Sequence, residues 1–186
     1  MIRDKLSGRG IMLRRKRLED ISNDYIWRSD PELSRMDAAP CLNMSIDEFK
    51  KIYEKQLRYP SPDTYRFAID TDIGKHIGNC MCYNIDIINH EAEVGIMIGN
   101  RDYWYKGHGY TAMILMIDYL FSVTSLRCLY LHTLEWNTPA RQCFQKCGFT
   151  QINTVTRNSH SFTRMELTKN QWQLIGSQRL AKIHKL

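Results

Sequence analysis

Two glycines that flank a single residue are the feature of this sequence best suited to bind a ligand. Gly107 and Gly109 stand in the run WYKGHGYTA, directly before the apolar run MILMIDYLF. A glycine-containing loop that enters a helix N-terminus presents unpaired backbone N–H groups, and the helix dipole adds positive potential. Glycine also lets a phosphate come close to the backbone. The run therefore predicts an anion-binding turn, although a plain tight turn fits the same residues.

The spacing of these glycines differs from the two commonest nucleotide loops. Thr111 and Ala112 follow where further glycine would be needed for a dinucleotide fingerprint, and the Gly-Lys-Ser/Thr ending of a P-loop is missing. The motif alone therefore does not name its ligand.

The cysteines do not form a metal-binding pattern. Cys80 and Cys82 share one face of a predicted strand, and Cys143 and Cys147 are spaced i, i+4 on a predicted helix. Neither pair has the further ligands of a four-coordinate zinc site. We expect reduced, mostly buried thiols and no metal.

Composition indicates one globular domain of 186 residues, with 43% hydrophobic and 25% charged residues. The net charge of +6 comes from the two ends, because residues 18–168 contain 15 Lys/Arg and 19 Asp/Glu. Basic ends without interleaved aromatic residues are typical of solvated tails, so no nucleic-acid partner is expected. The apolar runs are too short to span a bilayer, and the first ten residues have no signal-peptide core. We expect a cytoplasmic protein with no membrane partner.

The first half of the chain alternates helical and strand patterns. Pro31 should end the first helix, and Ser45 with Glu48 forms a capping box before the second. In chain order, the patterns predict a strand over 10–18, a helix over 18–33, a helix over 48–58, and strands over 64–70, 76–85 and 91–99. A hairpin should join the strands at 64–70 and 76–85.

The second half continues with a helix, because apolar residues recur at helical spacing after the glycines: Met113, Met116, Ile117, Leu120 and Phe121. Asn137 is a suitable N-cap for a helix over 140–147, and Gly148 should end it. Further patterns predict strands over 128–134, 150–155 and 161–167, a loop TRNSH over 156–160, and a C-terminal helix that starts at the capping box Thr168–Gln171. These elements predict an α+β fold.

Two motifs in this order resemble the GNAT superfamily of acetyl-CoA-dependent N-acetyltransferases. The family's pyrophosphate loop, [QR]-x-x-G-x-[GA], falls on residues 104–109, with Trp104 in place of Gln or Arg. A second family signature, N-x-x-[AS]-x-x-x-[YF]-x-K-x-G-F, is matched by Asn137, Ala140, Phe144, Lys146, Gly148 and Phe149. Trp104 and the segment 17–36 resemble the branch that acetylates ribosomal-protein N-termini. The resemblance covers residues 10–168, and we expect a single domain over 1–186 with a C-terminal helix and basic tail over 169–186.

The resemblance implies a site for acetyl-CoA as co-substrate. Its mixed central sheet would splay between the fourth and fifth predicted strands, flanked by helices, and the pantetheine arm would pair with the backbone of Met97 and Ile98. Asn137 and Phe144 would contact the arm. The pyrophosphate would be bound by Lys106, Gly107, His108, Gly109, Tyr110 and Thr111.

The resemblance also implies the reaction, in which a neutral amine attacks a thioester. Glu93 is the first candidate for the base, and His132 and Tyr130 are alternatives. A backbone N–H near Ile98 would stabilise the oxyanion. Many family members use a tyrosine where this chain has Phe144, which cannot protonate the leaving thiolate. Another group or water must do so.

The acceptor is expected between the first two helices and the loop before the last strand. Candidate contacts are Trp27, Asp30, Met36, Tyr83 and the TRNSH loop. A protein or peptide N-terminus is the leading acceptor, with polyamines, amino sugars and aminoglycosides as alternatives. A catalytically silent acyl-CoA-binding module is the alternative from another class, and a homodimer stays open.

Overall fold

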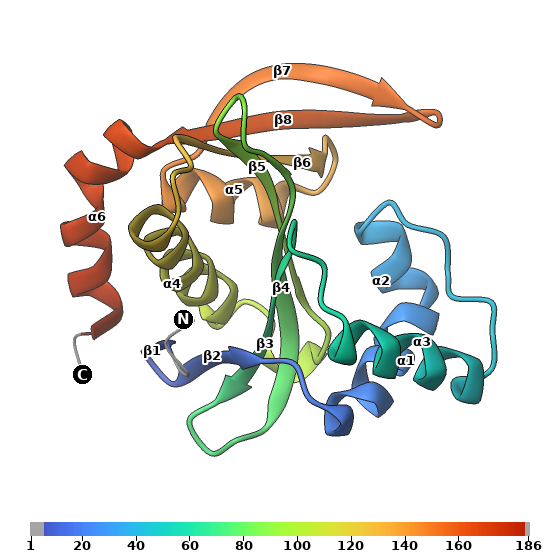
Figure 1. The fold of residues 1–186 in the computed structure, drawn as a ribbon. Helices are drawn as coiled ribbons and strands as arrows, with labels where there is room; N and C mark the ends of the chain where they lie inside the picture. The colour runs from blue at the N-terminus through green and yellow to red at the C-terminus, as the bar shows by residue number, and fades with distance from the viewer. Residues whose placement is uncertain (1–5, 185–186) are drawn as a thin grey trace.

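The computed structural model describes residues 6–184, which form eight strands and six α-helices with two short 3-10 turns (Figure 1). The strands are β1 (Leu6–Gly8), β2 (Ile11–Arg15), β3 (Tyr65–Thr71), β4 (His76–Asp86), β5 (Glu91–Ile98), β6 (Cys128–Leu134), β7 (Thr150–Arg157) and β8 (His160–Thr168). The helices are η1 (Leu18–Asp20), α1 (Ile21–Ser29), α2 (Pro31–Met36), α3 (Ile46–Arg58), η2 (Arg101–Tyr103), α4 (His108–Val123), α5 (Thr138–Cys147) and α6 (Lys169–His184).

The strands make one mixed sheet in the order β1-β2-β3-β4-β5-β6-β8-β7. Every neighbouring pair is antiparallel except β5 and β6, which are parallel. Their pairing is confined to Glu91–Glu93 against Cys128–Tyr130. Beyond this point the two strands separate, which confirms the α+β fold and the splay predicted between the strands at 91–98 and 128–134.

The helices cover both faces of the sheet. In Figure 1, α1, α2 and α3 lie to the right of the sheet, whereas α4 and α6 lie to its left. Helix α4 is buried on nearly every side along residues 111–121, as its continuous apolar run requires. It forms the centre of the core against β2, β4 and β5. Both capping boxes are confirmed, since Glu48 and Gln171 accept N–H groups of Ser45 and Thr168.

The chain departs from the predicted elements at three places. The helix over 18–33 is divided into η1, α1 and α2, because Asp30 is extended and caps a new helix that begins at Pro31. Strand β1, which forms a hairpin with β2, carries no pattern that predicted it. The predicted loop over 156–160 is mostly strand, and the turn is reduced to Asn158 and Ser159, both at positive φ.

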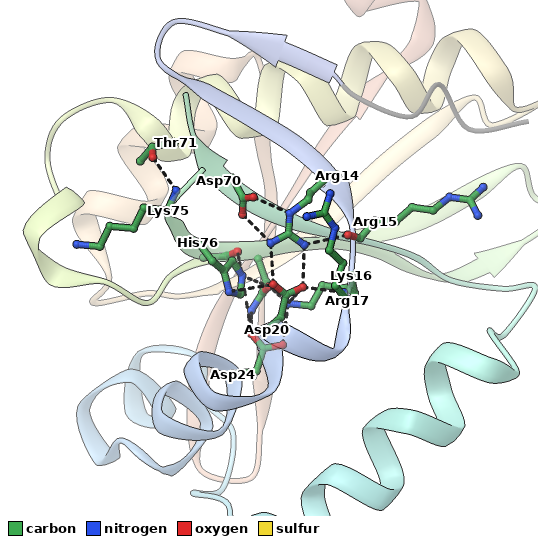
Figure 2. Close-up of polar contacts among 12 residues, drawn as sticks. Arg14, Arg15, Lys16, Arg17, Asp20, Asp24, Asp70, Thr71, Lys75 and His76 are labelled. Carbon is green, nitrogen blue, oxygen red and sulfur yellow. Dashed lines mark hydrogen bonds and ion pairs between the residues drawn. The ribbon is translucent and has the colours of Figure 1, made fainter. Parts of the chain in front are cut away.

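A buried network of charges joins the first helices to the sheet (Figure 2). The guanidinium of Arg14 on β2 donates to both carboxylate oxygens of Asp20 and of Asp70, at 2.6–2.9 Å. Lys16 pairs with Asp24 of α1 at 2.7 Å. The expectation that the N-terminal basic residues are solvated is therefore wrong for Arg14 and Lys16. Arg3, Lys5 and Lys185, which belong to the same expectation, lie outside the described residues.

Two further expectations concern metals and membranes. Within residues 6–184, no group of three His, Cys, Asp or Glu side chains is arranged to hold a metal ion. No helix of this part of the chain has the length and apolar content needed to cross a bilayer. Cys80, Cys82 and Cys147 are buried free thiols, whereas Cys41 is exposed.

Candidate active site

A cleft of about 570 Å³ opens where β5 separates from β6. Its walls come from the end of β5, the loop before α4, the first turns of α4 and α5, and the C-terminal end of α2. Of the residues predicted to bind the cofactor, those that line it are Met97, Ile98, Gly107, His108, Gly109, Tyr110 and Asn137. Segments that are far apart in the sequence thus converge on the splay, as the two motifs predicted.

The turn into α4 has the geometry of an anion-binding loop. Gly107 is the N-cap with φ of 85°, a left-handed conformation that favours glycine. The N–H of Thr111 makes the first helical bond, to the carbonyl of Gly107 at 3.0 Å. Within residues 6–184, the preceding N–H groups of His108, Gly109 and Tyr110 have no backbone acceptor. These groups and the helix dipole can bind a phosphate.

Gly109 keeps the cleft open at this turn. A methyl group added at Gly109 would point toward the side chains of Ile98 and Ile96, at 3.8 and 3.9 Å. Both isoleucines line the cleft. The absence of a side chain at Gly109 therefore leaves room between the helix and the edge of β5.

Trp104, which replaces the Gln or Arg of the family loop, ties this loop to β5. Its indole N–H donates to the carbonyl oxygen of Ile98 at 2.6 Å. The guanidinium of Arg101 lies 5.5 Å from the Trp104 ring and also pairs with Asp30 and Glu32. The loop is thus connected both to the strand behind the cleft and to α2 beside it.

Three predicted cofactor contacts lie outside the cleft lining. Lys106 lies 5.8 Å from the ring of Tyr103, and the Thr111 hydroxyl donates to the carbonyl of Gly107. Phe144 is buried against Phe149, with ring centroids 6.2 Å apart. All the predicted cofactor contacts stay predictions, whether or not the residue lines the cleft.

Glu93 lies at the last pairing position between β5 and β6, and both its oxygens are engaged. Oε1 is 2.8 Å from Nδ1 of His132, and Oε2 accepts a hydrogen bond from the Asn84 amide at 3.1 Å. The side chains of Glu93 and His132 are 11% and 7% exposed. The first candidate base and one of its alternatives are therefore in direct contact.

Two tyrosines surround this pair. Tyr83 is the register partner of Glu93 on β4, and Tyr130 is its partner on β6. Burial raises the pKa of Tyr83 far above its usual value, and the negative charges of Glu93 and Asp37 raise it further. Burial and the charge of Glu93 also raise the pKa of Tyr130. Both phenols are therefore neutral at physiological pH.

The predicted acceptor residues have different surroundings. Trp27 is buried, 4.9 Å from the His76 ring, and a side chain at Gly99 would collide with it. Asp30 caps α2 by accepting the N–H groups of Glu32 and Leu33. Trp27 and Asp30 thus have structural roles, whereas Met36 lines the cleft.

Asp37 follows Met36 in the cleft lining and was missed in the sequence, where nothing marks it. Its side chain is 46% exposed, and its carboxylate lies 3.5 Å from the Arg28 guanidinium. Partial desolvation of the Asp37 carboxyl raises its pKa, and the positive charge of Arg28 offsets part of this increase. The TRNSH segment contacts a candidate base through Arg157, whose Nη2 lies 3.5 Å from Nε2 of His132.

Comparisons with known proteins agree with this geometry. A spermidine N(1)-acetyltransferase of Vibrio cholerae is 28% identical over 107 residues, which are 58% of this chain and 60% of that enzyme. The match thus spans less than two thirds of the length of that relative. An uncharacterized N-acetyltransferase, p20 of Bacillus licheniformis, is 30% identical over 145 residues, covering 75% of this chain and 78% of the relative.

Solved structures share the fold. The spermidine N-acetyltransferase of Vibrio cholerae in complex with CoA and spermine superposes with a TM-score of 0.79 at 20% identity, covering 88% of this chain and 98% of that one. An aminoglycoside acetyltransferase in complex with coenzyme A superposes with a TM-score of 0.73 at 16% identity, with the same coverage. Residues 11–150 match the model of the Acetyltransferase (GNAT) domain, so this chain belongs to the GNAT acetyltransferase family.

Proposed function

We propose that this protein transfers an acetyl group from acetyl-CoA to a primary amine, and that the amine belongs to a polyamine. The observation that carries the proposal is the cleft in the splay, with unpaired N–H groups at one end and the buried Glu93–His132 pair beside the point where β5 and β6 separate. The N–H groups of the cleft suit a pyrophosphate. The Glu93–His132 pair, which lies outside the cleft lining, suits an amine that must lose a proton.

Coenzyme A would occupy the cleft from the glycine turn to the splay. The N–H groups of His108, Gly109 and Tyr110 would bind the pyrophosphate, and the pantetheine arm would lie along Met97 and Ile98. Asn137 would approach the arm from the start of α5, although its side-chain oxygen already accepts the N–H of Ala140 at 3.3 Å. The Asn137 amide N–H₂ is then the group that would contact the arm.

The chemistry requires an amine free of its proton, a stabilised oxyanion and a protonated leaving thiolate. A backbone N–H of the β5 end would stabilise the oxyanion, because a donor there faces the position at which charge develops. Phe144 has no proton to donate and is buried against Phe149. A thiol with an ordinary pKa of about 8.5 makes protonation of the leaving group an undemanding step.

A polyamine is favoured over a protein N-terminus as the acceptor. The Vibrio cholerae relative is a spermidine acetyltransferase, and the superposed structure from that organism contains spermine, whereas none of the proteins compared above is a ribosomal-protein acetyltransferase. The carboxylates of Asp37 and Glu93 both lie close enough to Tyr83 to raise its pKa. Asp37, whose side chain is partly exposed in the cleft lining, suits a substrate with a second ammonium group.

An acetyl-transfer screen tests this proposal. The protein is incubated with acetyl-CoA and, separately, spermidine, spermine, an aminoglycoside, an amino sugar and peptides with free N-termini. Thiol release is followed, and the product is identified by mass. Release that depends on a polyamine, with a product heavier by one acetyl group, supports the proposal.

Two results would contradict it. Faster transfer to N-terminal peptides than to polyamines would restore the protein N-terminus as the acceptor. Tight coenzyme A binding by calorimetry without thiol release for any amine would favour the silent acyl-CoA-binding module.

A further inference from the structure

Glu93 and His132 form a buried carboxylate–imidazole pair whose hydrogen bonds define the state of the imidazole. The Asn84 amide donates to Oε2 of Glu93, and Nδ1 of His132 lies 2.8 Å from Oε1. A carboxylate that already receives an amide N–H is an acceptor, so Nδ1 must carry the hydrogen of this bond. Nε2 of a neutral His132 therefore carries a lone pair, as a general base requires. This lone pair faces Nη2 of Arg157 at 3.5 Å, so Arg157 must give way to the amine during the reaction.

The position of His132 also suits a base. Glu93 and Tyr130 are the last residues that pair β5 with β6, and His132 lies two residues beyond Tyr130. Since alternate residues of a strand share a face, His132 lies on the same face as Tyr130 and Glu93. At this position β6 still pairs with β8, where Arg164 is the partner of His132, but it no longer pairs with β5. The imidazole thus lies just beyond the last pair of β5 and β6, although neither His132 nor Glu93 belongs to the cleft lining.

We propose that His132 is the catalytic base of the acetyl transfer and that Glu93 is a positioning residue that holds the imidazole in its reactive tautomer. This assignment rests on the proposed function. It changes the role of Glu93, whose two oxygens are occupied by His132 and Asn84 and so are poorly available to an amine.

The proposed reaction balances without another reactant. The lone pair of the amine forms a C–N bond with the thioester carbon while Nε2 of His132 takes a proton from nitrogen. The C–S bond then breaks, and its electron pair leaves with sulfur. The imidazolium returns the proton to the thiolate, which gives the amide and free coenzyme A. His132 thereby supplies the proton that Phe144 cannot.

The charged and titratable groups around His132 come from four strands. Glu93 of β5 favours a positive charge on the ring, whereas Arg157 of β7 and Arg164 of β8 oppose it. Tyr130 of β6 contacts the imidazole edge-on, with ring centroids 5.7 Å apart. The Arg164 guanidinium lies 4.1 Å from the Tyr130 ring and pairs with Glu166 at 2.7 Å and Glu91 at 3.5 Å, so its charge is largely compensated.

His132→Gln tests the assignment, because glutamine can still donate to Glu93 and so leaves no unpaired buried carboxylate. We expect kcat to fall about 10²- to 10⁴-fold, the usual contribution of a general base, while KM for acetyl-CoA stays unchanged. The acidic limb of the kcat pH profile should disappear. Imidazole added to His132→Ala should restore part of the rate. Glu93→Gln should lower kcat less than His132→Gln and retain the acidic limb, as a positioning role requires.

His184→Gln, on the exposed end of α6, is the matched control and should behave as the unaltered protein. If His132→Gln does not fold, the double variant Glu93→Gln/His132→Gln removes the buried charge as well and should show the same loss of kcat. An unchanged rate and an unchanged acidic limb in either folded variant would overturn the assignment while leaving the proposed function intact. If the unaltered protein acetylates no amine, the proposed function fails and the assignment fails with it.

Discussion

The indole N–H of Trp104 lies 2.6 Å from the carbonyl oxygen of Ile98, so the loop that precedes α4 is fastened to the end of β5. Ile98 lines the cleft together with Gly109, across which the phosphates and the arm of coenzyme A would pass. A side chain that holds the loop and the strand at a constant separation sets the width of the site before the cofactor arrives.

Trp104→Phe should therefore weaken cofactor binding. The ring would still pack, but the hydrogen bond to Ile98 would be lost, at a cost of about 1 kcal/mol. We expect KM for acetyl-CoA to rise about fivefold with little change in kcat, measured by thiol release. Trp136→Phe, which alters an exposed tryptophan outside the cleft lining, is the control. A kcat loss larger than the KM change would contradict a role in cofactor binding alone.

The two glycines of the loop should respond differently to alanine. Gly107 has φ of 85° with nothing within 4 Å of an added Cβ, so alanine there would be strained by its backbone conformation alone. We expect Gly107→Ala to lower the free energy of unfolding by about 1–2 kcal/mol. Gly109 lies in the first turn of α4, where alanine is a good helix former, so Gly109→Ala should be as stable as the unaltered protein.

Cofactor affinity separates these variants further. The methyl group of Gly109→Ala would point toward Ile96 and Ile98 and narrow the cleft, so coenzyme A should bind more weakly. Urea unfolding gives the stability of each variant, and calorimetry gives its affinity for coenzyme A. If Gly109→Ala and the unaltered protein bind coenzyme A equally well, the glycine turn is not part of the cofactor site.

Much of this architecture could be predicted from local patterns. The apolar run of α4, the capping residues Asn137 and Gly148, and the two GNAT signatures act over short stretches of chain, and each has a direct counterpart in the fold. The splay followed from the family resemblance. The residues that determine each of these features lie within one short segment, so the sequence of that segment is enough to predict it.

Contacts between distant segments were harder to predict. Arg14 and Lys16 belong to a basic run that looks like a solvated tail, yet their carboxylate partners come from η1, α1 and β3. The bond between Glu93 and His132 joins residues 39 positions apart, and it depends on the register of a short parallel pairing. Asp37 lines the cleft only because α2 is a separate helix that starts at Pro31. The sequence around each of these residues does not indicate which distant residues it will contact.

The buried network predicts how stability depends on pH. Burial of Asp20 favours its neutral form, but hydrogen bonds from Arg14 and the charges of Lys16 and His76 hold the pKa of this carboxyl below its usual value. Because the folded state has the lower pKa, Asp20 stabilises the fold above about pH 4, the range in which an unfolded aspartate is ionised. This contribution is lost as the pH falls through the lower pKa of the folded state.

Asp20→Asn should accordingly cost about 3–5 kcal/mol at pH 7, the usual effect of removing one partner from a buried ion pair. Urea unfolding at pH 7 and at about pH 3 should show that the difference from the unaltered protein shrinks in acid. Asp63→Asn, at an exposed position, should have little effect at either pH. A pH-independent difference for Asp20→Asn would mean that packing, rather than charge, accounts for the loss.

Asp37 should determine how well a substrate with several ammonium groups competes with one that has a single amine. Its carboxylate lines the cleft and lies close enough to Tyr83 to raise the pKa of that phenol, while 46% of its side chain remains exposed. A charge-assisted contact with a distal ammonium would contribute about 1.5–3 kcal/mol. Asp37→Asn should therefore reduce kcat/KM for spermidine about 10- to 100-fold. For a monoamine of similar length, kcat/KM should change little, because that substrate has no second ammonium group to contact Asp37. Glu32→Gln is a control on α2, the helix that Asp37 caps, since Glu32 pairs with Arg101 and does not line the cleft. If kcat/KM falls equally for spermidine and the monoamine, Asp37 affects the shape of the cleft and does not bind the second ammonium group.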